Sequence, residues 1–504
     1  MQQPVEAYPQ YADEQAWSQQ AYDAYQKQES SQITGSKIHF AVVFGLMVCY
    51  ALVSFAIPNL ETGNYAFKIA GGLVIFSLAF SRENRLALLG FAVPMYLPAK
   101  LSQTAMPGTD LMTEATAVFI ILAWMIAVIS DMGADRVKPN ALVPKLLLGA
   151  WLIWAAIGLF ASKNPYLWFS EYSVMLALPA AFGLAIRSPI TPSTIKRMFL
   201  GLGVSIVTYQ LAFALVTLVH AGAGALGELD NLRMLGKGMA ATYVTGESAL
   251  CVIALAFAVG LASSRVSRGL RWSAILFGIA PAGLAILLYI TRSSMIVAGL
   301  VVLVSLLLSK RRRAALVVAM VMLLAVTVFV LRSPEYVQSV TSRFSHTGAG
   351  YDLRAGIRQD ALRVAFEHPV FGVGIAQFKE YGETGIAHAH NEPLNIASEE
   401  GFPALMLYGA LCLVIMIKVF KARKATTDPF RLSVLFGVAM AALAYALVTE
   451  ANPLFFRRGG ILMAGLLGML YACSEPDSPP DPAYEYYDPA DVQAYAQPAN
   501  PGQG

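Results

Sequence analysis

Charged residues are scarce in this sequence, and their scarcity excludes an ordinary soluble protein. Only 13% of the 504 residues are Asp, Glu, Lys or Arg, whereas 57% are hydrophobic. A soluble globular chain carries about 25% charged residues, so the composition indicates a protein that spans a membrane. The formal net charge of +4 gives no basis for a nucleic-acid partner. The basic residues lie mainly in short loops between apolar runs, where they act as topology signals.

Cysteine is scarce as well. Cys49, Cys251, Cys412 and Cys473 lie in or at the edge of apolar stretches, and none belongs to a Cys-x-x-Cys pair. The sequence therefore predicts neither a disulfide framework nor a zinc cluster. A short basic segment before the first apolar run is also missing, because residues 1–36 are acidic and rich in Tyr and Gln. A cleaved signal peptide is not expected.

Apolar runs fill most of the chain, and a helix needs roughly 20 apolar residues to cross a bilayer. The sequence therefore predicts an all-α polytopic membrane protein with about 14 transmembrane helices, within a range of about 12–14. The candidate spans lie near residues 38–57, 66–80, 86–98, 114–130, 142–161, 170–186, 198–219, 240–263, 271–291, 294–309, 314–331, 402–420, 430–449 and 459–473.

The spans divide the chain into five parts. Residues 1–36 and 474–504 are low-complexity tails with net charges of −4 and −6, and we expect both to be disordered. Residues 37–331 hold the first eleven expected spans, and residues 402–473 hold the last three. The loop between them, residues 332–401, is too long to be a simple connection, so we expect it to carry the function.

Lysine and arginine alternate between the loops. If the N-terminus is cytoplasmic, the six inward loops carry two to five Lys and Arg residues each, and the short outward loops carry two or fewer. This alternation is what the positive-inside rule demands, so both tails are predicted to be cytoplasmic and the long loop to face outward. No ionisable residue falls convincingly at mid-membrane, which disfavours an ion-coupled transporter.

Three arginines stand out on the outward side. Arg292 lies in the tight turn YITRSSM between two spans, where it either contacts a bound phosphate or snorkels to lipid headgroups. Arg354 and Arg358 lie four apart on an expected helix and share one face. Their positive charges repel each other unless a carboxylate such as Asp352 or Glu367, or a bound anion, neutralises them. The planar fork of arginine fits phosphate in a bidentate manner.

The densest polar stretch, HAHNEPLNIASEEG, closes the long loop. Pro393 suits the first turn of a helix, and Asn391 or Glu392 can cap that turn. Gly401 suits the end, so the sequence predicts a short helix over 393–400.

His390 lies just before this expected helix, whose N-terminus favours anions. An imidazole at that position can exchange a proton with a bound substrate. Glu399 lies at the electrically unfavourable end of the helix, so a hydrogen bond to the loop is expected to hold it. A metal site is the alternative interpretation of the two nearby histidines, with His346, His368 or Glu399 completing it.

Three stretches together resemble one known family, the O-antigen ligase/polymerase superfamily of bacterial polysaccharide assembly. They are YITRSS (289–294), LRAGIRQDALRVAFEHPVFGVGIAQF (353–378) and HNEPLNIASEEG (390–401). The last follows the pattern H-N-x-x-L-x-x-x-x-E-x-G through His390, Asn391, Leu394, Glu399 and Gly401. The resemblance covers roughly residues 285–455, and the earlier spans agree only in hydropathy.

The resemblance implies a multi-pass bacterial inner-membrane glycosyltransferase that acts on glycans linked to undecaprenyl diphosphate at the outer face. It implies no metal, no other cofactor and no nucleotide sugar. Arg292 matches the first family arginine, Arg354 the loop arginine and His390 the motif histidine. We expect the two arginines to bind the diphosphate and His390 to act as the general base. Membrane lipids, a flippase and a chain-length regulator are the expected partners.

Four further residues are expected to support this site. Asn391 and Glu399 would orient His390, and Arg358 and Arg233 would contact phosphate or sugar. The sequence favours a polymerase of O-antigen, capsule or exopolysaccharide repeats. The alternatives are a ligase that transfers glycan to lipid A-core or protein, a polysaccharide flippase, and a structural membrane scaffold. A flippase should show two similar halves and a charged central cavity, and neither is evident.

Overall fold

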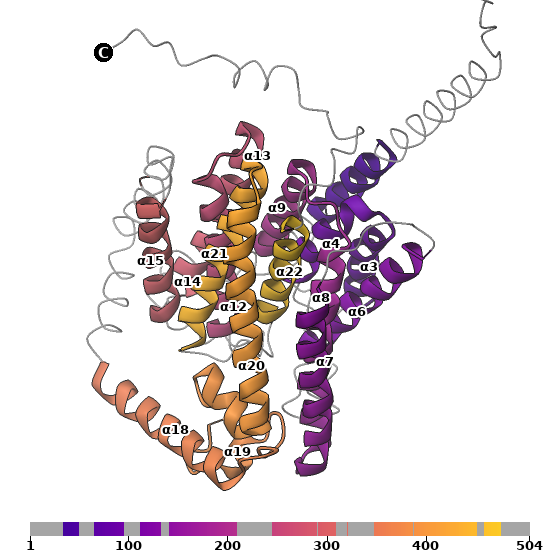
Figure 1. The fold of residues 1–504 in the computed structure, drawn as a ribbon. Coiled ribbons are helices and arrows are strands. Elements are labelled where there is room, and N and C mark those ends of the chain that lie inside the picture. Colours follow the sequence, from indigo (N-terminus) through magenta and orange to yellow (C-terminus); the bar gives the residue numbers. More distant parts are fainter. Residues whose placement is uncertain are drawn as a thin grey trace, which may run out of the picture. The chain divides into compact units, whose positions relative to one another are not determined.

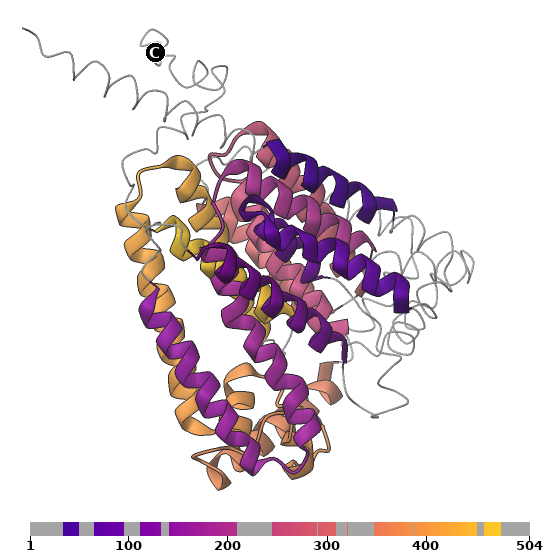
Figure 2. The same ribbon diagram turned by 90° about the vertical axis from the view of Figure 1, so that its right-hand side faces the viewer.

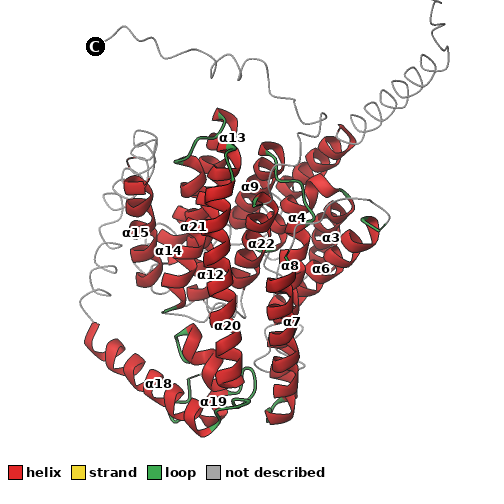
Figure 3. Cartoon of the chain, viewed as in Figure 1, coloured by secondary structure: helices red, strands yellow, loops and turns green. Residues whose placement is uncertain are grey.

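The computed structural model describes ten parts of the chain. These are residues 34–49, 65–94, 111–132, 141–208, 244–289, 291–308, 320, 347–386, 388–450 and 458–474. Within them every regular element is helical, which confirms the expected all-α class (Figure 3). The chain forms two compact units, one of Met1–Val42 with Asp477–Gly504 and one of Val43–Pro476. In the first unit only a helical segment at residues 34–42 is described.

Figure 1 shows the helices of the second unit. In chain order they are α3 (Tyr65–Phe76), η1 (Ser77–Phe80), η2 (Arg82–Asn84), α4 (Arg85–Ala92), α6 (Leu111–Ser130), α7 (Leu142–Ile157), η3 (Gly158–Ala161), α8 (Pro165–Ile186), α9 (Pro192–Ile206), α12 (Val244–Ala262), α13 (Arg268–Ser273), the π-helical η6 (Ala274–Ile279), α14 (Ala280–Tyr289), α15 (Arg292–Leu308), α18 (Thr347–Glu367), α19 (Phe378–Tyr381), α20 (Glu392–Ala425), α21 (Pro429–Thr449) and α22 (Arg458–Cys473).

Five helical stretches in the described residues are long and apolar enough to cross a membrane. They are Leu142–Ala161, Leu167–Ile186, Arg268–Leu287, Glu392–Ala425 and Pro429–Thr449. Shorter apolar helices lie at Thr34–Cys49, Gly71–Phe80, Ala117–Ser130, Ser248–Ala262, Arg292–Ser305 and Arg458–Cys473. The chain is therefore a helical membrane protein. The total of about 14 stays a prediction, because the expected span at 314–331 lies, apart from Met320, outside the described residues.

Helix α12 is buried from Ser248 to its end. It packs against α14, α15, α21 and α22, and residues 248–262 are all buried. Gly260 allows a close crossing of α12 and α21, because a Cβ added to it would lie 2.8 Å from the Cα of Gly437 on α21. Helices in membranes associate largely through such small-residue contacts, since apolar side chains gain little by leaving lipid.

The backbone of α20 breaks at Gly401. Its φ of 85° and ψ of 173° are non-helical, and an added Cβ would lie 2.0 Å from the carbonyl oxygen of Val370. Only glycine fits such a position. The chain then resumes as a helix, with the N–H of Phe402 donating to the carbonyl of Pro369 (2.9 Å). The expected end of a short polar helix at Gly401 is thus confirmed. Residues 392–400 form the polar segment of α20, and residues 402–425 form its apolar, spanning segment.

Helices α18 and α19, the loop around them and the polar segment of α20 share a small hydrophobic core. We call these parts, residues 347–400 without Ala387, the α18–α20 unit. Its core residues are Ile357, Ala361, Val364, Val373, Phe378 and Ala389. Figure 2 shows that α7 and α20 run side by side towards this unit, and the two helices are in contact. Residues 332–346 of the expected long loop lie outside the described part of the chain.

Candidate functional site

Three arginines converge where α15 begins. Arg292 is the first residue of α15, directly after the turn from α14, and α18 carries Arg354 and Arg358 one turn apart. Burial lowers the pKa of the Arg354 guanidinium, and the positive charges of Arg292 and Arg358 lower it further. Residues more than sixty positions apart in the sequence are therefore close enough to repel one another.

One of the two carboxylates expected to neutralise these arginines, Glu367, is engaged elsewhere. Glu367 lies 2.9 Å from Arg363, and Arg363 also donates to Asp360 (2.7 Å). Burial raises the pKa of Asp360, but the hydrogen bonds from Arg363 and Thr384 outweigh it and leave the pKa lowered. At pH values above the ordinary pKa of aspartate, the ion pair of Asp360 and Arg363 therefore stabilises the α18–α20 unit. This contribution is lost as the pH falls through the lowered pKa of Asp360. Glu367 therefore does not neutralise Arg292 or Arg354 in this structure.

Glu450 connects the arginine helix to the histidine segment. Its backbone carbonyl accepts a hydrogen bond from Arg358 Nη2 (2.7 Å), and its side chain accepts one from Asn391 Nδ2 (2.8 Å). Glu450 directly follows α21 and lies 59 residues from Asn391. It was not among the expected site residues. Its place at the end of an expected span was the only sequence signal, and that position alone does not identify a partner.

The backbone around His390 is held by the start of α20. Asn391 is the N-cap residue, and its Oδ1 accepts from the N–H of Leu394 (3.0 Å). This confirms the expected cap. His390 itself takes a φ of 54°, a left-handed conformation that few residues other than glycine adopt. Such a conformation persists only where the surroundings fix it, and it is frequent at functional sites.

Hydrogen bonds connect Glu399, through the side chain of Asn395, to the backbone of Ala389 beside His390. Glu399 is buried, and its carboxylate accepts hydrogen bonds from Asn395 Nδ2 (3.1 Å) and from the N–H of Phe378 (3.4 Å). Asn395 Oδ1 in turn accepts from the N–H of Ala389 (3.1 Å), the residue before His390. The expected hydrogen bond between Glu399 and the loop is confirmed. Asn395 was not expected, although its spacing of four residues from Glu399 places both on one helix face.

The neighbouring Glu400 fastens this unit to α7. Its Oε2 accepts from Trp151 Nε1 (2.6 Å), and its backbone carbonyl accepts from Trp154 Nε1 (3.0 Å). Trp151 is almost fully buried at this contact. The pair links residues 249 positions apart, so the site is built on a spanning helix from the first half of the chain.

The remaining expected residues do not join this constellation. Arg233 and His346 lie outside the described residues. His368 packs edge-on against Tyr381, with ring centroids 5.3 Å apart. The part of the chain that the structure describes contains no group of three or more His, Cys, Asp or Glu side chains that could hold a metal ion.

Comparison with known proteins identifies this region. Residues 274–409 match the family model Wzy_C, described as O-antigen ligase. The match includes Arg292, Arg354, His390 and Glu399, whereas Glu450 lies beyond it. No curated protein matches the chain significantly. Members of this family are glycosyltransferase-like enzymes whose substrate is a lipid-linked polysaccharide in a membrane. Residues 274–409 thus match an O-antigen ligase family model, which supports the expected resemblance to the O-antigen ligase/polymerase superfamily of polysaccharide biosynthesis.

Proposed function

We propose that the protein is a glycosyltransferase of the bacterial inner membrane that polymerises oligosaccharide repeats linked to undecaprenyl diphosphate. The product would be an O-antigen, capsule or exopolysaccharide, made at the outer face, with both tails cytoplasmic. The observation that carries the proposal is the pair of hydrogen bonds by which Glu450 joins Arg358 of α18 to Asn391, the residue after His390; Arg292 and Arg358 also lie near enough to Arg354 to lower its pKa. These contacts support a connected arrangement of the proposed phosphate-binding arginines and the candidate base.

The reaction follows from the chemistry of these groups. A hydroxyl of the acceptor sugar attacks the anomeric carbon of the donor, and the bond from that carbon to the diphosphate oxygen breaks. His390 takes the hydroxyl proton, a role worth about 10²–10⁴-fold in rate. The diphosphate leaves with an additional negative charge, which Arg292 and Arg354 stabilise. Groups aimed at a developing charge commonly contribute about 3 kcal/mol each.

The other residues position these groups. Asn391 fixes the start of α20 and is held by Glu450. Glu399 acts at a distance, through Asn395 and the backbone of Ala389. Arg358 donates one N–H to the backbone carbonyl of Glu450. Its other N–H groups would donate to a phosphate or sugar oxygen, and we propose the same role for Arg233.

A ligase is the second candidate, because the matching family model is itself described as O-antigen ligase. A ligase would use the same donor and the same leaving group, but its acceptor would be lipid A-core or a protein. The difference lies in the acceptor surface. A flippase that delivers the donor and a chain-length regulator are the partners that a polymerase would need.

Deletion of the gene separates the two enzymes. Loss of a polymerase is expected to leave glycans one repeat long, because donor and acceptor are both single lipid-linked repeats at the start. Electrophoresis of the extracted glycans measures this length. Long chains that remain attached to the lipid carrier and absent from lipid A-core would reject the polymerase and establish the ligase.

Activity is expected to survive chelation. Arginines rather than a metal ion neutralise the leaving diphosphate in this proposal, so EDTA should change the rate less than about twofold. Polymer formation from purified lipid-linked repeat, with and without EDTA, measures the effect. A loss that Mg²⁺, Mn²⁺ or Zn²⁺ restores would reject the arginine mechanism. A metal-dependent glycosyltransferase assayed in the same buffer provides the positive control.

A further inference from the structure

Four large apolar side chains of the α18–α20 unit are exposed. The exposed fractions are 44% for Leu362, 69% for Phe366, 49% for Val370 and 42% for Phe371. We call these four residues the α18 apolar surface. Single exposed apolar residues are ordinary, but neighbouring ones usually mark an interaction surface. Leu362 and Phe366 lie one turn apart on α18, on a face distinct from that of the buried Ile357, Ala361 and Val364.

Two aromatic contacts join this surface to candidate spanning helices. The ring of Phe371 stacks on Trp154 of α7, with centroids 5.0 Å apart, and the ring of Phe366 lies 5.6 Å from that of Phe402. Trp154 belongs to the candidate span Leu142–Ala161, and Phe402 begins the spanning segment of α20. Through Phe371 and Phe366 the α18 apolar surface therefore contacts both candidate spans.

A third contact marks where the span on α7 ends. A Cβ added to Gly374 would lie 3.1 Å from Cα of Ser162, the residue that follows Ala161. The loop at Gly374 thus lies at the end of this candidate span.

Both spans expose apolar side chains over the same stretch. On α7 and η3 the exposed fractions are 67% for Ile153, 38% for Ile157 and 91% for Phe160, and Met406 on α20 is 74% exposed. In a spanning helix such side chains contact acyl chains. The α18 apolar surface lies at the same level of the two spans, and through Phe402 and Trp154 it continues their apolar side chains.

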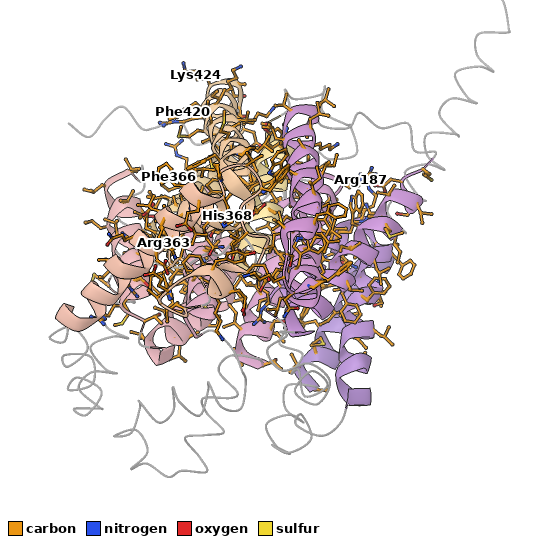
Figure 4. The ribbon with its side chains drawn as sticks, turned by 90° about the horizontal axis from the view of Figure 1, so that it is seen from below. Arg187, Arg363, Phe366, His368, Phe420 and Lys424 are labelled. Atoms are coloured by element: carbon orange, nitrogen blue, oxygen red, sulfur yellow. The ribbon has the colours of Figure 1, made fainter. Side chains whose placement is uncertain are left out.

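We propose that Leu362, Phe366, Val370 and Phe371 insert into the adjacent leaflet, which in the proposed orientation is the outer one. The α18–α20 unit would then rest in the bilayer surface as an interfacial element. Charged Arg363 and Glu367 flank Phe366, as expected for a helix whose apolar side chains enter the headgroup boundary. Figure 4 shows Phe366 on the same side of the molecule as Arg363 and His368.

Insertion has a consequence for the site, and this consequence alone rests on the proposed function. Arg354 and Arg358 are on the same helix as Leu362 and Phe366. An α18 anchored in lipid would hold both arginines near the headgroups, where the diphosphate of a membrane-borne donor lies. The donor would then need no transfer into water to meet them.

The test uses the full chain in nanodiscs of phosphatidylethanolamine and phosphatidylglycerol. Alanine replaces the exposed Cys49 and Cys412. An environment-sensitive fluorophore is attached to F366C or, as the matched control, to E383C, whose side chain is 81% exposed on the same unit. Nitroxide-labelled phosphatidylcholine in the disc and iodide in the buffer serve as the two quenchers.

The fluorophore at position 366 is expected to be quenched at least threefold more by the lipid nitroxide than the fluorophore at position 383. Iodide should show the reverse order. Equal iodide quenching at both positions would overturn insertion. Protection of position 366 from both quenchers would overturn it too, and would indicate a second copy or another protein on this surface. The readout needs no enzyme activity, so it stands or falls independently of the proposed function.

Discussion

Replacing His390 by alanine is expected to abolish glycan chain growth while the protein still inserts and accumulates. The imidazole is the proposed acceptor of the hydroxyl proton, and no neighbouring group in the described residues is expected to replace it. Loss of such a base lowers the rate by about 10²–10⁴-fold, which the assay registers as no polymer. The measurement is polymer formation by purified protein from lipid-linked repeat, with protein amount matched by immunoblot.

The backbone at this position requires a second variant. His390 has a φ of 54°, and alanine is strained in that region, whereas asparagine adopts it more readily. His390→Asn therefore keeps the loop conformation while it removes the base, and it should be as inactive as His390→Ala. His388→Ala is the matched control and should be milder, because His388 lies outside the family pattern. Equal losses at both histidines would instead favour the metal interpretation.

Local rules explain why several features of this site could be predicted. Pro393 and Asn391 begin a helix through fixed φ and a side-chain cap, and both effects act within a single turn. Gly401 ends it because a side chain would collide with Val370, although the sequence indicated only that glycine suits a helix end. The pairing of Arg354 with Arg358 follows from the helical period alone. Features that depend on three or four neighbouring residues can thus be predicted from the sequence.

Contacts between distant segments could not be predicted in the same way. Glu450 and Trp151 meet their partners across 59 and 249 residues, and such meetings depend on how the spans pack. Hydropathy gives little register, because a spanning helix is apolar all round. The convergence of Arg292 with Arg354 could be inferred only from the family resemblance, since nothing in either segment specifies the other.

Replacing Arg292 or Arg354 by lysine is expected to remove most of the activity. Lysine keeps the charge but lacks the planar fork that binds two phosphate oxygens at once. A hydrogen bond to a charged group contributes about 1.5–3 kcal/mol, so each substitution should slow polymer formation by roughly 10- to 150-fold. Arg423→Lys, an exposed position at the far end of α20, is the matched control and should retain full activity.

The double variant distinguishes a shared ligand from two separate anchors. If Arg292 and Arg354 bind the same diphosphate, the first substitution already weakens the binding to which the second arginine contributes. The rate of the double variant should therefore fall by less than the product of the two single losses. Independent contacts with lipid headgroups would give effects that multiply. Such contacts would also tolerate lysine, because snorkelling needs only a charge on a long stem. Near-normal polymer formation by both single variants would therefore assign these arginines to membrane anchoring. The repulsion that the structure shows between Arg354 and Arg292 would then be balanced by lipid phosphate in place of the substrate.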